Sequence, residues 1–237
     1  MPIAQIKKEL RQAASPEKAA ILQRFFKTGP GEYGAGDKFI GVVMPDQRVI
    51  AKKYFEILSL PETEELLHSP YHEDRMLALI ILTFKFAKAT AGEQAKIYKL
   101  YLKNTKWINN WDLVDVTTPR IVGAYSFYHD RQLVYKLVKS KSLWERRIAV
   151  LATFYYIKQG EISDSLALAK LLLKDDHDLM HKAVGWMLRE VGKADQKALE
   201  NFLDEFAHRM PRTMLRYSIE RLPESRKKKY LSIKKVV

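Results

Sequence analysis

The chain has 237 residues, of which 47% are hydrophobic and 29% charged, a balance typical of a folded protein rather than a disordered one. It contains no cysteine, which excludes disulfides, thiolate zinc sites and cysteine nucleophiles. Its 41 Lys and Arg against 28 Asp and Glu leave a formal net charge of +13, which favours a polyanionic partner such as nucleic acid over a merely basic surface.

The start of the chain and its apolar runs favour a cytoplasmic protein. The first eight residues lack the apolar core of a signal peptide. The longest apolar run, residues 76–84, is about half of the roughly 20 residues that a membrane-spanning helix requires. We therefore expect no membrane partner.

Helix signals continue along the whole chain. Ser15 and Ser69 each precede a proline, as at the capped start of a helix. The apolar residues that follow recur at spacings of three and four, and the alternation typical of strands is rare. Gly192 is expected to end the helical run before it. We predict an all-α chain with helices near residues 3–13, 16–28, 46–58, 71–88, 92–102, 107–117, 130–139, 142–158, 161–173, 177–191, 195–208 and 211–222.

Five short segments of similar sequence recur at nearly constant intervals. Their first residues are 36, 36, 35 and 34 positions apart, close to one helix pair per repeat in HEAT and tetratricopeptide arrays. This period predicts an α-solenoid of HEAT-like repeats (an α-α superhelix), one curved domain over residues 1–237 with a frayed basic tail at about 224–237. The five segments begin at Arg75, Trp111, Arg147, Lys182 and Arg216.

The first position of the repeat holds four cations and one tryptophan. Equivalent positions in a solenoid face the same way, so these side chains are expected to form a basic stripe that contacts phosphates. The alternative is a set of surface cations whose apolar stems cover the core.

The position four residues later, on the same helical face, holds an exception. Asp115 stands where two neighbouring repeats have leucine. A charge at a partly buried position is costly unless it is paired, so such exceptions tend to mark sites. Trp111 and Trp186 would give this acid aromatic walls, a setting that favours a flat cation. The alternative is an aspartate that caps a helix or pairs with Arg147.

Two further motifs are weaker. His177 and His181 lie one turn apart, but no third ligand is evident and a surface pair or a DNA-facing His181 is the better interpretation. The glycines of residues 31–36 lack both a dinucleotide fingerprint and a P-loop, so this segment is expected to be a flexible connection. We expect no metal and no cofactor.

Residues 109–115, 143–150 and 181–190 resemble the AlkD-like family of bacterial DNA alkylation repair glycosylases. The segments 31–45 and 69–75 are also similar to that family, and the likeness runs from about residue 15 to residue 222. It implies HEAT-like repeats whose concave face wraps duplex DNA, and an activity that removes positively charged N3- and N7-alkylated purines.

The resemblance also assigns roles to particular residues. Asp115 matches the family's catalytic acid, Trp111 and Trp186 match its flanking tryptophans, and Arg147 matches a DNA-contacting arginine. Phe25, or alternatively Phe26, matches an aromatic residue near the family's site. The basic stripe adds Lys182 and Arg75 to the expected DNA contacts.

The expected function is that of a monofunctional DNA-alkylpurine glycosylase. Its partner would be double-stranded DNA with alkylated bases, such as N3-methyladenine or N7-methylguanine. The protein would act as a monomer in the bacterial cytoplasm, associated with the nucleoid. The alternatives are a non-catalytic HEAT-repeat protein that binds damaged or branched DNA, and a scaffold that binds proteins.

Overall fold

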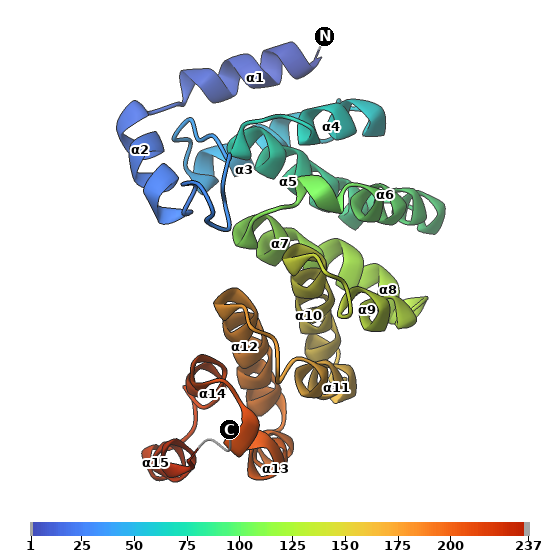
Figure 1. Cartoon of the computed structure of the whole chain (residues 1–237). Coiled ribbons are helices and arrows are strands. Elements are labelled where there is room, and N and C mark those ends of the chain that lie inside the picture. Colours follow the sequence, from blue (N-terminus) through green and yellow to red (C-terminus); the bar gives the residue numbers. More distant parts are fainter. Residues whose placement is uncertain (1, 235–237) are drawn as a thin grey trace. The chain divides into compact units, whose positions relative to one another are not determined.

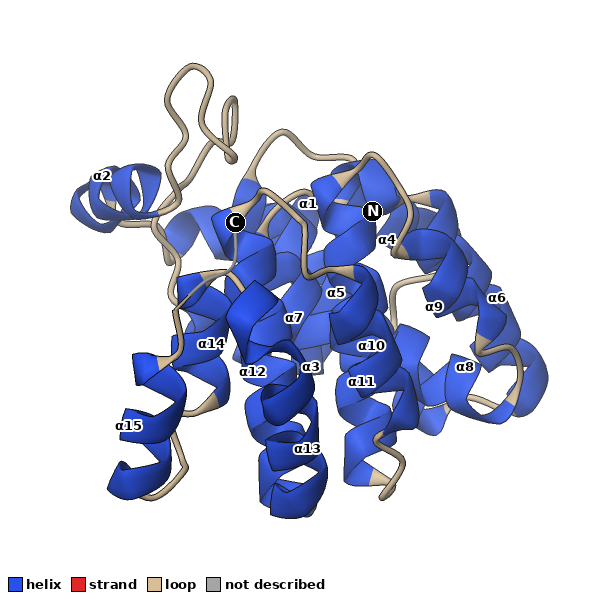
Figure 2. Ribbon diagram, turned by 60° about the horizontal axis from the view of Figure 1, so that its bottom comes forward, coloured by secondary structure: helices blue, strands red, loops and turns tan. Residues whose placement is uncertain are grey.

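The computed structural model describes residues 2–234. The chain forms two compact units, residues 1–121 and 122–237. Figure 2 shows helices joined by loops, and the described residues contain no strand beyond one isolated bridge between Lys38 and Tyr71. The predicted all-α, helical-repeat fold is confirmed. The single domain over 1–237 stays a prediction.

The first unit is organised around one long helix. This helix, α5, is buried along most of its length and packs against α3, α4, α6 and α7, which surround it in Figure 1. A loop of residues 26–43 joins α2 to α3. The elements of this unit are α1 (Pro2–Gln12), α2 (Pro16–Phe25), α3 (Met44–Tyr54), α4 (Leu60–Leu67), α5 (His72–Lys88), α6 (Ala91–Lys103), the 3₁₀ helix η1 (Thr105–Trp107) and α7 (Trp111–Thr118).

The second unit has two central helices, α10 and α12, which pack against each other. The first also contacts α8, α9 and α11, and the second contacts α11, α13 and α14. The π-helix η2 (Pro119–Gly123) contains the boundary between the units. The elements that follow are α8 (Ala124–Tyr128), α9 (Gln132–Leu137), α10 (Leu143–Lys158), α11 (Ser163–Leu171), α12 (Asp178–Ala194), α13 (Gln196–Phe206), the 3₁₀ helix η3 (Ala207–Arg209), α14 (Arg212–Ser218) and α15 (Glu224–Ser232).

The five repeat positions all lie on helices. They lie within the first five residues of α5, α7, α10, α12 and α14. In the first unit α5 packs on α7, and in the second α12 packs on both α10 and α14. The period read from the sequence therefore corresponds to successive packed helices within each unit.

The basic C-terminal segment differs from the frayed tail that the sequence predicts. Residues 224–232 form α15, whose Tyr230 is fully buried. Lys229 pairs with Asp204 at 2.6 Å, and Arg226 lies 3.7 Å from Glu200. The buried aromatic ring and these ion pairs hold the segment on the second unit as far as residue 232. Residues 235–237 lie outside the described residues.

Candidate functional site

Helix α7 carries two of the predicted site residues, Trp111 and Asp115. Its N-cap is Asn110, which is fully buried and whose side-chain oxygen accepts a hydrogen bond from the Trp111 N–H at 2.9 Å. Two positions further on, Asp112 accepts a hydrogen bond from the Leu113 N–H at 2.8 Å. A carboxylate in the first turn also interacts favourably with the positive end of the helix. Polar side chains therefore fix the point at which α7 begins.

Asp115 is a half-buried residue in the middle of α7. It follows Trp111 by four residues, so both side chains lie on one face of the helix. Tyr101, fully buried, hydrogen-bonds to Thr117 and Thr118 of the same helix, and burial together with the nearby charge of Asp115 raises the pKa of Tyr101 to about 12. The N-cap of α7 is Asn110, and Asp115 lies one turn into the helix.

Trp111 belongs to an aromatic cluster, which we define as Phe25, Phe26, Phe39 and Trp111. The Phe26 ring lies between two others, stacked on Trp111 at 5.2 Å and on Phe39 at 4.9 Å between ring centroids. Phe25 meets Trp111 edge-on at 6.0 Å. Phe26 is 6% exposed, whereas Phe25 is 61% exposed. Of the two candidates for the family's aromatic position, Phe25 is the one whose ring is open to a ligand.

A buried charge network, Arg75–Asp37–His72–Asp112, lies next to this cluster. The two nitrogens of the His72 ring contact different carboxylates, with Nδ1 3.1 Å from Asp37 Oδ2 and Nε2 2.8 Å from Asp112 Oδ2. Arg75 Nη2 pairs with the other oxygen of Asp37 at 2.5 Å. Two cations therefore balance two carboxylates, as buried charges require.

The protonation states in the network follow from this geometry. Burial favours the neutral form of His72, but the charge of Asp112 and hydrogen bonds to both carboxylates outweigh it and raise the pKa of His72 to about 9. Burial likewise favours the neutral form of Asp37, but the His72 hydrogen bond and the Arg75 charge lower the pKa of Asp37 below its usual value. At neutral pH His72 is therefore an imidazolium that donates from both nitrogens.

Two further acids at the start of α5 hold neighbouring segments. The Glu73 carboxylate accepts hydrogen bonds from the backbone N–H groups of Ile40, Gly41 and Val42 at 2.8 to 3.4 Å. Asp74 forms a two-point ion pair with Arg11 of α1, with both N–O distances 2.9 Å. The start of α5 therefore holds α1 and the 26–43 loop on the first unit.

Arg75 requires a correction. The sequence predicts that it contacts DNA phosphates, but the residue is 2% exposed and its guanidinium is bound to Asp37 and to the Ser69 carbonyl at 3.2 Å. Removing it would leave Asp37 short of a countercharge. The basic stripe is therefore interrupted at this position, and Arg75 is a structural residue of the charge network.

The other predicted residues lie in the second unit. Arg147 of α10 is 4% exposed and donates to the Leu179 carbonyl at 2.6 Å. Lys182 of α12 is half-buried and pairs with Asp178 at 2.7 Å. Trp186 is half-buried, 5.7 Å from the Phe154 ring, and its Nε1–H donates to Glu190 at 3.2 Å. Their roles toward DNA stay predictions.

The structure adds site residues that the sequence analysis did not single out: Asp37, His72, Asp112 and Asn110. One signal was available in the sequence, the run of four ionisable residues from His72 to Arg75 at the start of an otherwise apolar helix. Such a run on a helix that becomes a core element must be buried together with its partners.

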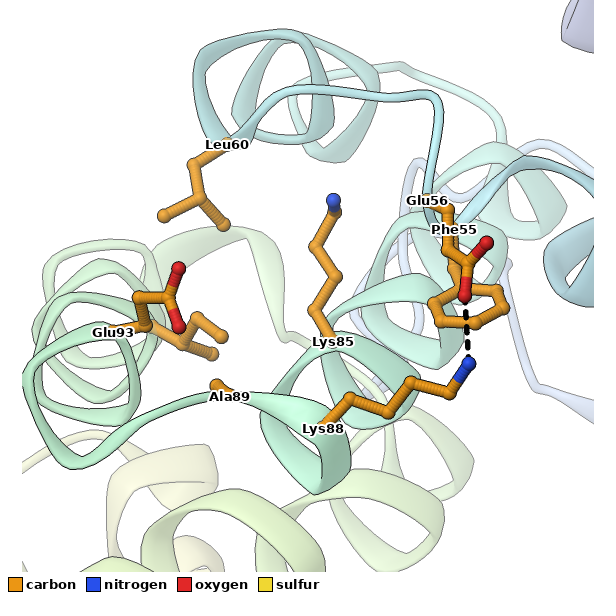
Figure 3. Close-up of a pocket in the computed structure, with 8 residues that line it drawn as sticks. Phe55, Glu56, Leu60, Lys85, Lys88, Ala89 and Glu93 are labelled. Atoms are coloured by element: carbon orange, nitrogen blue, oxygen red, sulfur yellow. Dashed lines mark hydrogen bonds and ion pairs between the residues drawn. The ribbon is translucent and has the colours of Figure 1, made fainter.

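The described residues offer no candidate metal centre, because no group of three or more His, Asp or Glu side chains among them could hold a metal ion. One pocket of about 270 Å³ in the first unit is lined by Phe55, Leu60 and Lys85 among others (Figure 3), with Lys88 and Glu56 paired at its edge. It contains none of the predicted site residues.

No helix among the described residues is long and apolar enough to cross a membrane.

Comparisons with known proteins give one family match and one similar solved structure. Residues 6–222 match the family model described as DNA alkylation repair enzyme. A solved structure, described as a predicted DNA alkylation repair enzyme from Enterococcus faecalis, superposes with a TM-score of 0.70 at 16% sequence identity. The superposition covers 89% of this chain and 97% of that chain, and at this identity it establishes the fold. No curated protein matches the chain.

Proposed function

Because the chain belongs to the DNA alkylation repair enzyme family, we propose that it is a monofunctional glycosylase that hydrolyses the N-glycosidic bond of positively charged alkylated purines in duplex DNA. N3-methyladenine and N7-methylguanine are the proposed type of lesion. The protein is proposed to act as a monomer in the bacterial cytoplasm, associated with the nucleoid.

The observation that carries this proposal is the pair Trp111 and Asp115 on one face of α7. The acid is half-buried and the neighbouring Phe25 ring is exposed. An anionic group beside aromatic rings favours a planar cation, through Coulomb attraction and through the negative faces of the rings. An alkylated purine is such a cation.

The chemistry needs few groups. The alkylated base leaves as a neutral molecule, so its departure requires no general acid, in contrast to the two carboxylates of most sugar hydrolases. Positive charge develops on the deoxyribose as the bond breaks. Asp115 would stabilise that charge and orient or deprotonate the attacking water, while the face of Trp111 contacts the sugar.

The remaining assignments follow the family's sequence pattern. Trp186 is proposed as a second aromatic contact to the sugar, and Arg147 and Lys182 as contacts to the DNA backbone. Phe25 is proposed to contact the DNA next to Trp111, without the hydroxyl that a tyrosine would bring.

The decisive experiment compares Asp115→Asn with the wild-type protein on duplex DNA that contains N7-methylguanine. We expect base release in single turnovers to fall at least about 100-fold, the loss typical of removing a group that stabilises transition-state charge, while affinity for the duplex changes little. Glu205→Gln, which neutralises an exposed carboxylate on α13, serves as the charge-matched control.

Two outcomes would contradict the proposal. If Asp115→Asn releases the base at the wild-type rate, Asp115 is not the catalytic acid. If the wild-type protein binds methylated duplex in a salt-sensitive manner and releases no base, the chain is a DNA-binding member of the family rather than a glycosylase.

A further inference from the structure

We propose that His72 is a positioning residue of the candidate site: by bridging Asp37 and Asp112 it fixes the first turn of α7, and with it the directions of Trp111 and Asp115. The effect on catalysis rests on the proposed function. The effect on the position of Trp111 does not, because it can be measured without a reaction.

The first step of the argument is the double contact of the ring. His72 is 2% exposed, and both of its nitrogens face carboxylate oxygens. Asp112 belongs to α7, and Asp37 belongs to the 26–43 loop. A neutral imidazole has a single N–H and would turn one lone pair toward one of these carboxylates. Only the doubly protonated ring can therefore hold both segments.

A second connection runs through the helix cap. Asp37 Oδ2, the oxygen that contacts His72, also accepts a hydrogen bond from Asn110 Nδ2 at 3.2 Å. Asn110 in turn caps α7 by accepting from the Trp111 N–H. His72 therefore acts on the start of α7 twice, directly through Asp112 and indirectly through Asp37 and Asn110.

A third connection is made by stacked rings. The His72 ring stacks on Phe39 at 4.4 Å and lies 5.2 Å from Phe26, and Phe26 stacks on Trp111. An imidazolium against aromatic faces is attracted by their quadrupoles. The face of the His72 ring therefore supports the ring column that ends at Trp111, while its edges hold the backbone that carries Trp111.

The charges around His72 make its contacts with Asp37 and Asp112 sensitive to pH. The groups that face it are Asp112 from α7, Asp37 from the loop and, through Asp37, Arg75 from α5. With His72 charged, the network is neutral. With His72 deprotonated, it carries one uncompensated buried negative charge. Since the raised pKa of His72 is about 9, both contacts are present at neutral pH and one of them is lost as the pH rises through that value.

Three variants test the proposal. In His72→Gln both N–H donors of the amide are on one nitrogen, so this nitrogen satisfies one carboxylate while the amide oxygen faces and repels the other. In His72→Gln combined with Asp112→Asn, the new amide at position 112 can donate to that oxygen, which restores both contacts without charge. In Asp112→Asn alone, the amide accepts from a charged ring and donates to a neutral one, so the contact survives on both sides of the titration.

The reaction readout is the single-turnover rate of N7-methylguanine release between pH 6.5 and 9.5. We expect His72→Gln to lose on the order of 10- to 100-fold, as a displaced catalytic group does, with duplex affinity within about threefold of wild type. The double variant is expected to recover most of the loss. The rate of wild type should fall toward pH 9.5, and that of Asp112→Asn and of the double variant should not.

A second readout needs no activity. The indole N–H resonance of Trp111, assigned with Trp111→Phe, should move in His72→Gln and return in the double variant, while that of Trp107, which stacks on His68, stays in place. If His72→Gln does not fold, the pH dependence of Asp112→Asn still tests the proposal. The Asp112 side chain is 15% exposed, against 3% for His72, so its substitution is expected to disturb the fold less.

The outcomes separate the two proposals. An unchanged rate and an unchanged Trp111 resonance in His72→Gln overturn the positioning role, as does an alkaline fall in Asp112→Asn equal to that of wild type. A wild-type protein that releases no base, but whose Trp111 resonance responds as described, overturns the glycosylase proposal and leaves the positioning role standing.

Discussion

Two adjacent phenylalanines at the end of α2 have opposite surroundings. Phe26 is covered on both faces by Phe39 and Trp111, whereas Phe25 makes T-shaped contacts with Phe26 and Trp111 and is 61% exposed. A large apolar ring left in water has no stabilising role of its own. The difference separates a packing residue from one that is available to a ligand.

This pair gives a residue-scale prediction. Phe26→Ala should lower the free energy of unfolding by about 3–5 kcal/mol, the usual cost of a deleted core ring. Phe25→Ala should change it by less than about 0.5 kcal/mol and still reduce the rate of base release, because it removes a contact to DNA. Urea denaturation and single-turnover kinetics measure the two effects. A destabilising Phe25→Ala with normal kinetics would assign Phe25 to the core instead.

Trp111 and Asp115 could be identified from the sequence because each differs in chemical type from the residues at the equivalent positions of the other repeats. It did not identify His72 as part of the same site. The partners of His72 lie 35 and 40 residues away, in a loop and in another helix. Long-range pairs of this kind produce no periodic pattern in the sequence. For the same reason the sequence predicts a DNA contact for Arg75, which the structure pairs with Asp37.

At the scale of elements, α7 depends on its surroundings. It has only eight residues, and isolated helices shorter than about 12 residues are marginal in water. Its stability must therefore come from packing on α5, from the Asn110 cap and from the charge network.

We accordingly expect Asn110→Ala to be costly. It removes the cap of α7 and the hydrogen bond to Asp37 at a fully buried position, so the free energy of unfolding should fall by about 2 kcal/mol or more. Ser15→Ala removes a cap at the more exposed start of α2, where the hydrogen bond is 3.3 Å long, and should cost about 0.5–1 kcal/mol. Equal losses in the two variants, measured by urea denaturation, would contradict a special role for Asn110.

Most helices could be predicted, and the exceptions are informative. Helix α4 is not among the predicted helices, although Ser59 and Glu62 form a capping box there. Neither are α8 and α15, which are short or strongly charged. The sequence also predicts that a helix ends before Gly192. In the structure α12 continues to Ala194, and a Cβ at Gly192 would collide with Leu199. That glycine permits close packing of α13, a tertiary requirement that resembles a cap in sequence.

At the scale of the whole molecule, the 41 Lys and Arg side chains behind the net charge of +13 are of two kinds. Some form ion pairs within the protein, such as Arg75 with Asp37 and Lys229 with Asp204. Others, such as Arg216 in the last turn of α14, are exposed, and the Arg216 side chain makes no hydrogen bond or ion pair within the part of the chain that the structure describes. Only the exposed cations of the second kind can bind DNA phosphates, and so release counterions, without breaking an ion pair within the protein.

The salt dependence of DNA binding should reveal this division. For an unmodified duplex, the slope of log Kd against log salt concentration should decrease by about one in Arg216→Gln, because one phosphate contact is lost. Lys229→Gln, which removes a charge already paired with Asp204, should leave the slope unchanged. Both variants lower the net charge by one, so a common long-range field would change both slopes equally. A difference between them would locate binding on the repeat positions rather than on α15, and equal slopes would contradict a phosphate contact at Arg216.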